Sequence, residues 1–246
     1  MSRDRAPAPG PANGPRVALV TGADGGLGRA IVRRLERAGW RVAAGTHREG
    51  PLAADVADPA QARSLVERVV EGFGGLHLLV ANHAAMSMAP AHEHPLDDWW
   101  RIVDTNLSGS FYLARAAVPH LRAANGSIVL VSSEWGVIGW PGASAYAASK
   151  SGLIGLTRAL ARELAPGVRV NAIAPGVIDT PQLAVDAADA GITLDEMKRR
   201  YADASPLRRI ADPDEIAASI EFLASDGAAY YTGQVLHPNG GATTAS

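Results

Sequence analysis

The sequence of 246 residues contains no cysteine and few aromatic residues, which make up 5% of the chain. The lack of cysteine excludes a disulfide scaffold and a metal site built from thiolates. It fits a reducing compartment, so we expect a cytoplasmic protein. No apolar run approaches the roughly 18 residues that cross a bilayer. We therefore expect no membrane association.

An excess of either charge is also lacking, because 23 Lys and Arg residues oppose 25 Asp and Glu residues for a net charge of −2. Without a block of basic residues, the sequence has no electrostatic footprint of nucleic-acid binding, and we expect no such partner. His92, Glu93 and His94, with His83 nearby, are the alternative source of a metal site. A histidine-rich loop flanked by prolines is more often solvated, so we expect no metal.

Lysine is nearly absent, because only Lys150 and Lys198 are lysines and the other cations are arginines. A lysine in such a chain indicates a position that needs a compact, titratable ammonium group rather than a guanidinium. Drift in composition is the alternative explanation.

The abundant residues are those of a folded chain, with 47% hydrophobic and 20% charged residues. A chain of this length buries about 70–75% of its unfolded surface, which is enough for a stable core. Residues 1–15 are rich in Ala, Pro and Gly and lack the apolar segment of a signal peptide, so we predict a disordered tail there. Residues 16–246 contain no repeat or linker, and we predict one domain.

Apolar segments typical of buried strands alternate along the chain with segments of helical periodicity. The predicted strands are residues 16–21, 40–46, 76–82, 127–132, 168–174 and 234–237. The predicted helices are residues 26–38, 59–70, 96–121, 143–164 and 213–224. Asp58 is the expected N-cap of the second helix, and the long third helix is expected to bend, with Gly109 inside it. Such alternation predicts an α/β fold whose parallel sheet is covered by helices on both faces. Residues 181–205 break the alternation, and their polar, alanine-rich composition predicts a helical flap.

Four glycines lie in the turn between the first strand and the first helix, where residues 21–28 read TGADGGLG. Glycines let this turn be tight and let the backbone approach a pyrophosphate, which then binds the free N–H groups of the helix N-terminus. An ordinary strand-to-helix turn is the alternative. The position of the turn, after the first strand and at the start of the first helix, favours dinucleotide binding.

The spacing TGxxxGxG resembles that of the short-chain dehydrogenase/reductase family, and further motifs agree with it in order. Residues 146–150 read YAASK, which matches the family's YxxxK; residues 171–180 read NAIAPGVIDT, and residues 230–241 read YYTGQVLHPNGG. The resemblance covers residues 16–241. It implies a Rossmann-like, doubly wound parallel sheet in a single domain, and hydride transfer between a nicotinamide and a carbonyl carbon.

The resemblance also implies which residues form the site. The catalytic residues are Asn106, Ser133, Tyr146 and Lys150. The cofactor-binding residues are Gly22, Asp24, Gly26, Leu27, Gly28, Thr46, His47, Arg48, Asp55, Val56, Asn82, His83, Ala84, Tyr146, Lys150, Pro175, Gly176, Ile178 and Thr180. By the same resemblance, Asn106 anchors a water that relays protons from Lys150 to solvent.

Tyr146 and Lys150 are four residues apart on a predicted helix, so their side chains share one face. A phenol whose pKa is near 10 is a poor base at pH 7, and a nearby ammonium favours its ionised form. Taken alone, the two residues would more often form a surface pair. Ser133 follows a predicted strand and would hydrogen-bond the substrate oxygen, so the catalytic interpretation is favoured.

Two departures from the family pattern concern the cofactor side. The family's Asn-Asn-Ala-Gly is replaced here by residues 81–84, which read ANHA, so His83 puts a large polar ring in place of a methyl group. Only eight residues separate Thr46 from Asp55, too few for the helix that many family members have there. We expect a more open pocket on the adenine side.

The dinucleotide is expected to be NADP(H), although NAD(H) stays open. Thr46 is neutral where NAD-specific folds carry an acid that binds the ribose hydroxyl. His47 and Arg48 follow it, and a guanidinium binds a phosphate through two charge-assisted hydrogen bonds. Against this stand Gly25, where many NADP-using relatives have a basic residue, and Asp24, which would repel a phosphate.

The substrate is expected to be a small ketone or secondary alcohol. The residues expected to bind it are Ser133, Glu134, Trp135, Trp140, Tyr146, Leu183 and Met197. Glu134 indicates a substrate with hydroxyl or amine groups, unless it points to solvent. The 3-oxoacyl-(acyl-carrier-protein) reductases are the alternative subgroup, but the sequence shows no clear basic patch for a carrier protein. An alternative of another class, a dinucleotide-binding sensor without turnover, would be expected to lack one of the catalytic residues.

The last expectation concerns assembly. Ala148, Gly152 and Gly155 are small residues on the helix that carries Tyr146, spaced for close approach of another helix. Family members commonly form tetramers through such helices, and we expect a homotetramer with two-fold symmetric interfaces.

Overall fold

The computed structural model describes residues 14–243, so most of the predicted tail, residues 1–13, lies outside the described residues. The described chain forms one six-stranded parallel sheet in the order β2-β1-β3-β4-β5-β6. The strands are β1 Val17–Thr21, β2 Arg41–Gly45, β3 Leu78–Ala81, β4 Ser127–Val131, β5 Arg169–Ile173 and β6 Val235–Leu236. The predicted α/β, doubly wound, single-domain fold is confirmed.

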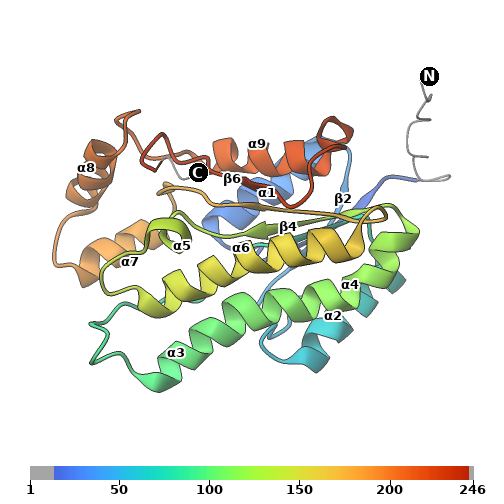
Figure 1. Ribbon diagram of the computed structural model, residues 1–246, viewed down its shortest axis with the longest axis horizontal. Coiled ribbons are helices and arrows are strands. Elements are labelled where there is room, and N and C mark those ends of the chain that lie inside the picture. The colour runs from blue at the N-terminus through green and yellow to red at the C-terminus, as the bar shows by residue number, and fades with distance from the viewer. Residues whose placement is uncertain (1–13, 244–246) are drawn as a thin grey trace.

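Helices cover both faces of this sheet, α1 and α9 above it and α2, α4 and α6 below it in Figure 1. The helices are α1 Gly26–Arg37, α2 Pro59–Phe73, α3 Leu96–Val103, α4 Gly109–Ala123, α5 Trp135–Ile138, α6 Ser144–Leu164, α7 Gln182–Asp189, α8 Leu194–Ala204 and α9 Pro213–Ala224. Successive residues of β1 alternate between the two cores: Leu19 packs with α2, α4 and α6, whereas Val20 packs with α1 and α9. Burial on both faces is why the strands are uninterrupted apolar runs.

Local chemistry determines where the helices begin and bend. The Asp58 side chain caps α2, as predicted, and accepts hydrogen bonds from the Ala60 and Gln61 amides. These bonds lower the pKa of Asp58. The long third helix is divided, as expected, by one turn of π-helix, Asp104–Ser108, immediately before Gly109. Such π-turns are frequent at functional sites.

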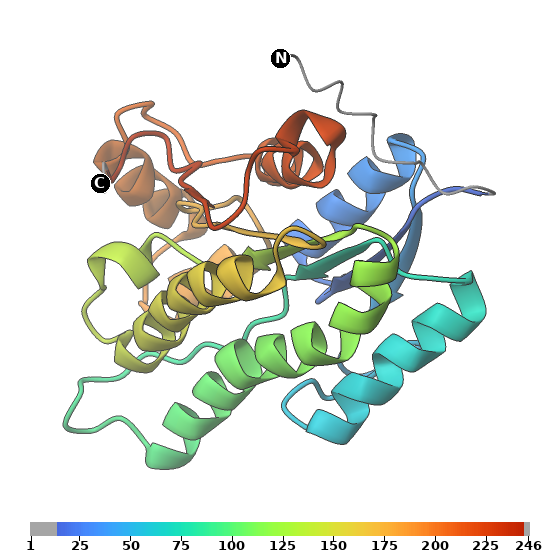
Figure 2. The same ribbon diagram turned by 45° about the vertical axis from the view of Figure 1, so that its right-hand side comes forward.

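Two further expectations about the chain path are confirmed. No helix lies between β2 and Asp55, because Thr46 is paired with Ala53 by an isolated bridge. Residues 181–205 form the helical flap, made of α7 and α8. Figures 1 and 2 show both helices at the same end of the molecule, beyond the sheet.

The strand order identifies where a ligand would bind. From β1 the chain moves outward to β2 and then returns to the other side of β1 with β3. In an open α/β sheet, ligands bind at such a reversal, outside the carboxyl ends of the strands.

Among residues 14–243, no helix is both long and apolar enough to span a membrane.

Candidate active site

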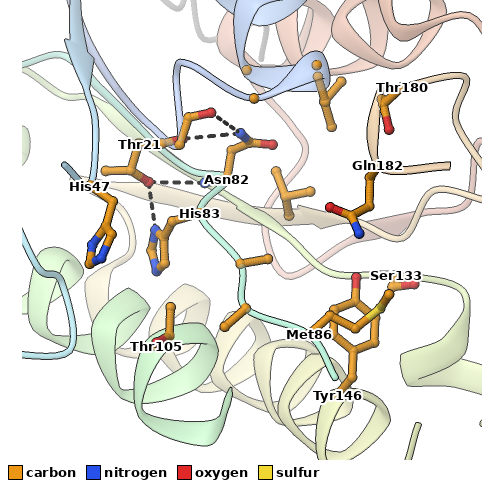
Figure 3. Close-up of a pocket in the computed structure, with 18 of the residues that line it drawn as sticks. Thr21, His47, Asn82, His83, Met86, Thr105, Ser133, Tyr146, Thr180 and Gln182 are labelled. Carbon is orange, nitrogen blue, oxygen red and sulfur yellow. Dashed lines mark hydrogen bonds between the residues drawn. The ribbon is translucent and has the colours of Figure 1, made fainter. Parts of the chain in front are cut away.

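A cavity of about 950 Å³ lies at the carboxyl ends of the strands and extends under the flap. Every residue that the sequence predicts to bind the cofactor lines it, from the glycine turn to Thr180. Figure 3 shows the long axis of this arrangement, with His47 and His83 at one end and Ser133 and Tyr146 at the other. The fold thus brings predicted residues from eight separate segments into one cavity.

The glycine turn offers a cradle for a pyrophosphate. Helix α1 begins at Gly26, its N-cap Gly25 makes no side-chain hydrogen bond, and its first turn contains no acidic residue. A Cβ atom at Gly26 would lie 2.7 Å from Cβ of Thr180, so a side chain there would close the space. Asn82 fixes the turn, because its amide nitrogen donates to the carbonyls of Thr21 and Gly22 at 3.2 and 3.1 Å. The residues present fit a dinucleotide phosphate group.

At the end of the cavity where the sequence predicts that the adenine side of the dinucleotide binds, polar side chains line the cavity. His47 and Arg48 are exposed and line it, and the Thr46 hydroxyl donates to the carbonyl of Glu49. The Asp55 carboxylate accepts a hydrogen bond from the Ala57 amide at 3.0 Å through one oxygen. The guanidinium of Arg48 therefore lies beside this end of the cavity, as the sequence predicts. No helix of the described chain covers this end.

His83, the departure from the family pattern, lies in the floor of the cavity. Its Nδ1 atom is 2.7 Å from the Thr21 hydroxyl, and its Nε2 atom is 3.4 Å from the Ser110 hydroxyl. Burial, assisted by the positive charge of Lys150, lowers the pKa of His83 to about 3. The imidazole is therefore neutral and joins the end of β1 to α4.

At the other end, Tyr146 and Lys150 lie on α6, as predicted. The Lys150 Nζ atom donates to the Val131 carbonyl at 2.8 Å and lies 5.5 Å from the centre of the Tyr146 ring. A Cβ atom at Gly136 would lie 2.8 Å from Cβ of Lys150, so glycine there lets α5 pack directly on α6 at this residue. The root of Lys150 therefore packs against α5, while its ammonium is held at the end of β4.

The protonation of the pair differs from the simple expectation. Burial is the largest influence on Tyr146 and raises its pKa to about 12, against a smaller lowering by a hydrogen bond with Ser133. The expected lowering by Lys150 is not found, because burial also lowers the pKa of that ammonium, to about 8. Tyr146 is therefore a protonated phenol at neutral pH, so it carries the proton that a reduction would need.

Asn106 lies in the π-turn and is fully buried, but it does not line the cavity. Its side chain accepts from the Ala85 amide at 2.7 Å and donates to the Ala85 carbonyl and the Ser149 hydroxyl, both at 3.0 Å. The Ser149 hydroxyl in turn donates to the Tyr146 carbonyl at 2.8 Å. Asn106 thus holds the first turn of α6 in place, and its role in a proton relay stays a prediction.

The predicted substrate residues are divided between two cavities. Ser133, Glu134, Trp135, Tyr146 and Leu183 line the main one. Trp140 lies instead in an adjoining cavity of about 330 Å³, and Met197, buried on the inner side of α8, lines neither. The lining of the two cavities therefore does not support direct contact between Met197 and the substrate.

Sequence reasoning missed several residues that line the main cavity. They are Thr21, Gly25, Gly45, Ala54, Ala57, Leu65, Ala85, Met86, Arg101, Asp104, Thr105, Val131, Ser132, Val177, Gln182, Asp186 and Tyr201. Some are neighbours of a recognised motif, which is the signal that would have found them. Met86 and Gln182, which point into the cavity beside Tyr146 and Thr180 in Figure 3, each lie two residues beyond such a motif, whereas Asp186 and Tyr201 belong to the flap, which has none. Across residues 14–243, no cluster of three His, Asp or Glu side chains could hold a metal.

Fold and cavity together define a dinucleotide-binding α/β protein with a Tyr–Lys pair beside the cradle. The profile of a family described as enoyl-(acyl carrier protein) reductase matches residues 22–243. The chain belongs to the short-chain dehydrogenase/reductase family.

Relatives and solved structures agree with this assignment. The chain is 38% identical to a 3-oxoacyl-(acyl-carrier-protein) reductase of Staphylococcus aureus, with 91% of this chain and 96% of that protein covered. It is also 38% identical to cis-4-hydroxycyclohexanecarboxylate dehydrogenase of Sinomonas cyclohexanicum, with 93% and 96% covered. The ligand-free aldohexose dehydrogenase of Thermoplasma acidophilum matches with a TM-score of 0.89 at 32% identity, over 95% of this chain and 98% of that one.

The family assignment establishes the general chemistry. The protein is an NAD(P)-dependent oxidoreductase that acts on CH–OH or keto groups of small molecules.

Proposed function

We propose that the protein interconverts a small ketone and its secondary alcohol, with NADP(H) as the favoured dinucleotide. The observation that carries this proposal is that Ser133, Tyr146 and Lys150 line one end of the same cavity that the glycine cradle lines. A polar acid–base group beside the nicotinamide end of such a cavity is what carbonyl reduction needs.

In this proposal, the glycine turn and Thr180 would hold a reduced dinucleotide, which would supply the hydride that the carbonyl carbon accepts. The Ser133 hydroxyl hydrogen-bonds the carbonyl oxygen and holds it beside Tyr146. The Tyr146 phenol, whose pKa is about 12 in the free site, transfers its proton to that oxygen. The positive charge of the Lys150 ammonium stabilises the phenolate that forms. One ketone, one reduced dinucleotide and one proton thus give one alcohol and one oxidised dinucleotide.

A spectrophotometric screen tests the proposal against a sensor without turnover. Small ketones are supplied with NADPH or NADH, and secondary alcohols with NADP⁺ or NAD⁺, while absorbance of the reduced dinucleotide is followed. We expect steady consumption or formation with several substrates. Tight dinucleotide binding without turnover of any compound would instead support the sensor.

Reduction of 3-oxoacyl thioesters is the second candidate, favoured by the names of several relatives that are 36–38% identical. The screen therefore includes acetoacetyl-coenzyme A and acetoacetyl-loaded acyl carrier protein. A kcat/KM for the carrier-bound substrate well above those of small ketones would favour this candidate over the first.

Arg48 is the residue we propose to select NADP(H). It is exposed, lines the adenine end and lies two residues beyond the neutral Thr46. We expect Arg48→Ala to lower the ratio of kcat/KM with NADPH to that with NADH by about tenfold to a hundredfold, the worth of a charge-assisted contact. Initial rates with both cofactors measure this.

The matched control is Arg63→Ala, which removes an exposed arginine of α2 that pairs with Glu67 and does not line the cavity. It should leave the ratio unchanged. A parent enzyme that prefers NADH, or an unchanged ratio in Arg48→Ala, would show that Arg48 is only a solvated loop residue.

We also propose that the protein is a homotetramer assembled through α6. Of the three small residues on this helix, Gly152 already packs within the chain, since a Cβ atom there would lie 2.8 Å from the Leu107 side chain. Ala148 and Gly155 are exposed. Phe111 of α4 and Trp100 of α3 are exposed large apolar side chains.

A cytoplasmic location remains a prediction that rests on the lack of cysteine.

The assembly proposal is tested by Gly155→Trp. A Cβ atom at Gly155 would meet no atom of the chain itself within 4 Å, so we expect the substitution to obstruct an approaching helix while the monomer still folds. We expect light scattering at micromolar concentration to give a tetramer mass for the parent and a smaller mass for the variant. Gly72→Trp on α2, which also meets no atom within 4 Å, is the control and should stay tetrameric. A monomeric parent would refute the proposal.

A further inference from the structure

An unpaired carboxylate lies at the substrate end of the cavity. Glu134 follows Ser133 directly and is only 7% exposed. Its Oε2 atom is buried without a hydrogen-bond partner among the described residues. Glu134 lines both the main cavity and the smaller one of about 330 Å³, together with Trp135, Val177 and Tyr201. It therefore lies where the two cavities meet.

A buried carboxylate without a partner is unfavourable, because it has lost its hydration and gained no hydrogen bond. Burial accordingly raises the pKa of Glu134. A bound group that pairs with this carboxylate would remove the cost. The partner is either a set of hydroxyl donors or a cation, and the surroundings of Glu134 distinguish the two.

A second acid strengthens the negative field. Asp186 of α7 lines the main cavity. It is close enough to the phenols of Tyr146 and Tyr201 for its charge to raise the pKa of both, and Glu134 adds to this effect at Tyr201. Hydroxyl groups would donate hydrogen bonds to the carboxylate of Glu134 but leave the negative field uncompensated. A cation would pair with the carboxylate and also compensate the field.

The basic side chains that line the two cavities do not neutralise this field. Arg101 pairs with Asp98 at 2.9 Å, and Arg209 of the smaller cavity pairs with Glu215 at 2.6 Å. Arg48 lies at the adenine end. The pKa of Lys150 is about 8, so this ammonium is charged at neutral pH, but it is held by the Val131 carbonyl at 2.8 Å. The substrate end therefore favours a positively charged ligand.

Aromatic rings surround the same place. Trp135 and Trp140 are stacked, with ring centres 5.0 Å apart and planes at 4°. Trp140 in turn lies 6.4 Å from Tyr201, and Trp135 lies 6.0 Å from Tyr146. Faces of such rings attract organic cations, most strongly where water is excluded. Carboxylates and aromatic faces together are the groups that recognise an alkylammonium.

We propose that the substrate is a ketone or secondary alcohol that carries an alkylammonium group, which binds between Glu134 and the aromatic cluster of Trp135, Trp140 and Tyr201. This inference rests on the proposed function and names its substrate class. The carbonyl group lies at Ser133 and Tyr146, and the cationic group lies toward the junction of the two cavities. The redox chemistry is unchanged from that described above.

A pair of ketones of equal shape isolates the charge. The first is (2-oxopropyl)trimethylammonium, which is permanently cationic, and the second is 4,4-dimethylpentan-2-one, in which carbon replaces the nitrogen. We expect kcat/KM for the cationic ketone to be higher by about tenfold or more, the worth of a charge-assisted contact in a desolvated site. Erythrulose serves as the polyhydroxylated comparison and should be a poorer substrate than the cation.

Three variants locate the source of the preference. Glu134→Gln keeps the shape of the side chain and should lower the cationic-to-neutral ratio by about tenfold, mainly through KM. Asp186→Asn should lower it by a smaller factor. Asp189→Asn, which removes an exposed acid of the same helix that does not line either cavity, should leave it unchanged. Thermal unfolding of each variant checks that the fold is retained.

The outcomes separate this inference from the proposed function. A ratio near one, a preference for the neutral ketone or erythrulose, or an unchanged ratio in both Glu134→Gln and Asp186→Asn would overturn the inference while the proposed function stands. If no ketone is turned over, the proposed function fails, and calorimetric titration with (2-oxopropyl)trimethylammonium decides the inference. Binding that Glu134→Gln weakens would support a cation site, and no binding would overturn it.

Discussion

Replacing Tyr146 by phenylalanine is expected to lower kcat for ketone reduction by about a factor of 10² to 10⁴, the usual worth of a positioned acid. The substitution removes only the hydroxyl group, which is the proton donor in the proposed reaction. The ring keeps its edge contact with Trp135, 6.0 Å between centres, so the fold and the cradle should survive. Steady-state rates and calorimetric dinucleotide binding measure the two effects separately.

The matched control is Tyr230→Phe, because Tyr230 is 95% exposed and lies outside both cavities. It should have the rate of the parent. Near-normal turnover of Tyr146→Phe would remove Tyr146 from the mechanism. Loss of dinucleotide affinity equal to the loss of rate would show that the hydroxyl acts in binding rather than in proton transfer.

Most of the fold could be predicted because its signals are local. All five residues of β1 are buried, which the unbroken apolar run of that strand indicates. The Asp58 cap and the start of α9 at Pro213 are likewise encoded within a few residues. The π-turn was expected only as a bend, because its hydrogen-bond pattern depends on packing against the rest of the molecule. Strand ends also differ by one or two residues, since pairing with neighbours determines where a strand stops.

The candidate site likewise contains residues that the sequence indicates and residues that only the folded chain shows. The glycine turn and the YxxxK segment are contiguous, so a single sequence shows them. Asp186 and Tyr201 reach the cavity only because α7 and α8 fold back over it, and nothing in the flap's composition predicts which of its side chains face inward. Of the two flap residues that we expect to bind the substrate, Leu183 lines the main cavity and Met197 lines neither cavity.

Burial is the property that sequence reasoning handled least well. The spacing of Tyr146 and Lys150 indicates an ammonium beside a phenol, and that proximity alone would lower the pKa of the phenol. In the folded chain both groups are withdrawn from water, and desolvation moves the pKa of Tyr146 up and that of Lys150 down. The sign of such a shift depends on how deeply the fold encloses a group, which no short motif contains.

Lys150→Arg is the second substitution expected to abolish most activity, with kcat/KM for reduction falling by about 10² or more. Lys150 is 2% exposed, and its Nζ atom donates to the Val131 carbonyl at 2.8 Å. We expect that a planar guanidinium cannot reproduce this single compact contact while remaining near Tyr146. Lys198→Arg is the control, because Lys198 lies on α8 in a partly exposed ion pair with Asp179. It should have the parent's activity.

The pH dependence of the parent tests the charge of Lys150 directly. Since burial lowers the pKa of this ammonium to about 8, it is charged below that pH and neutral above it. The charge stabilises the phenolate that Tyr146 becomes on giving up its proton, so kcat/KM for reduction should be constant at pH 6–7 and fall as the pH rises through about 8. In Lys150→Arg the guanidinium stays charged at every accessible pH, so the fall should be absent from whatever activity remains. A parent profile that stays flat to pH 10, or the same fall in both proteins, would show that another group is responsible and that Lys150 serves only to hold the end of β4.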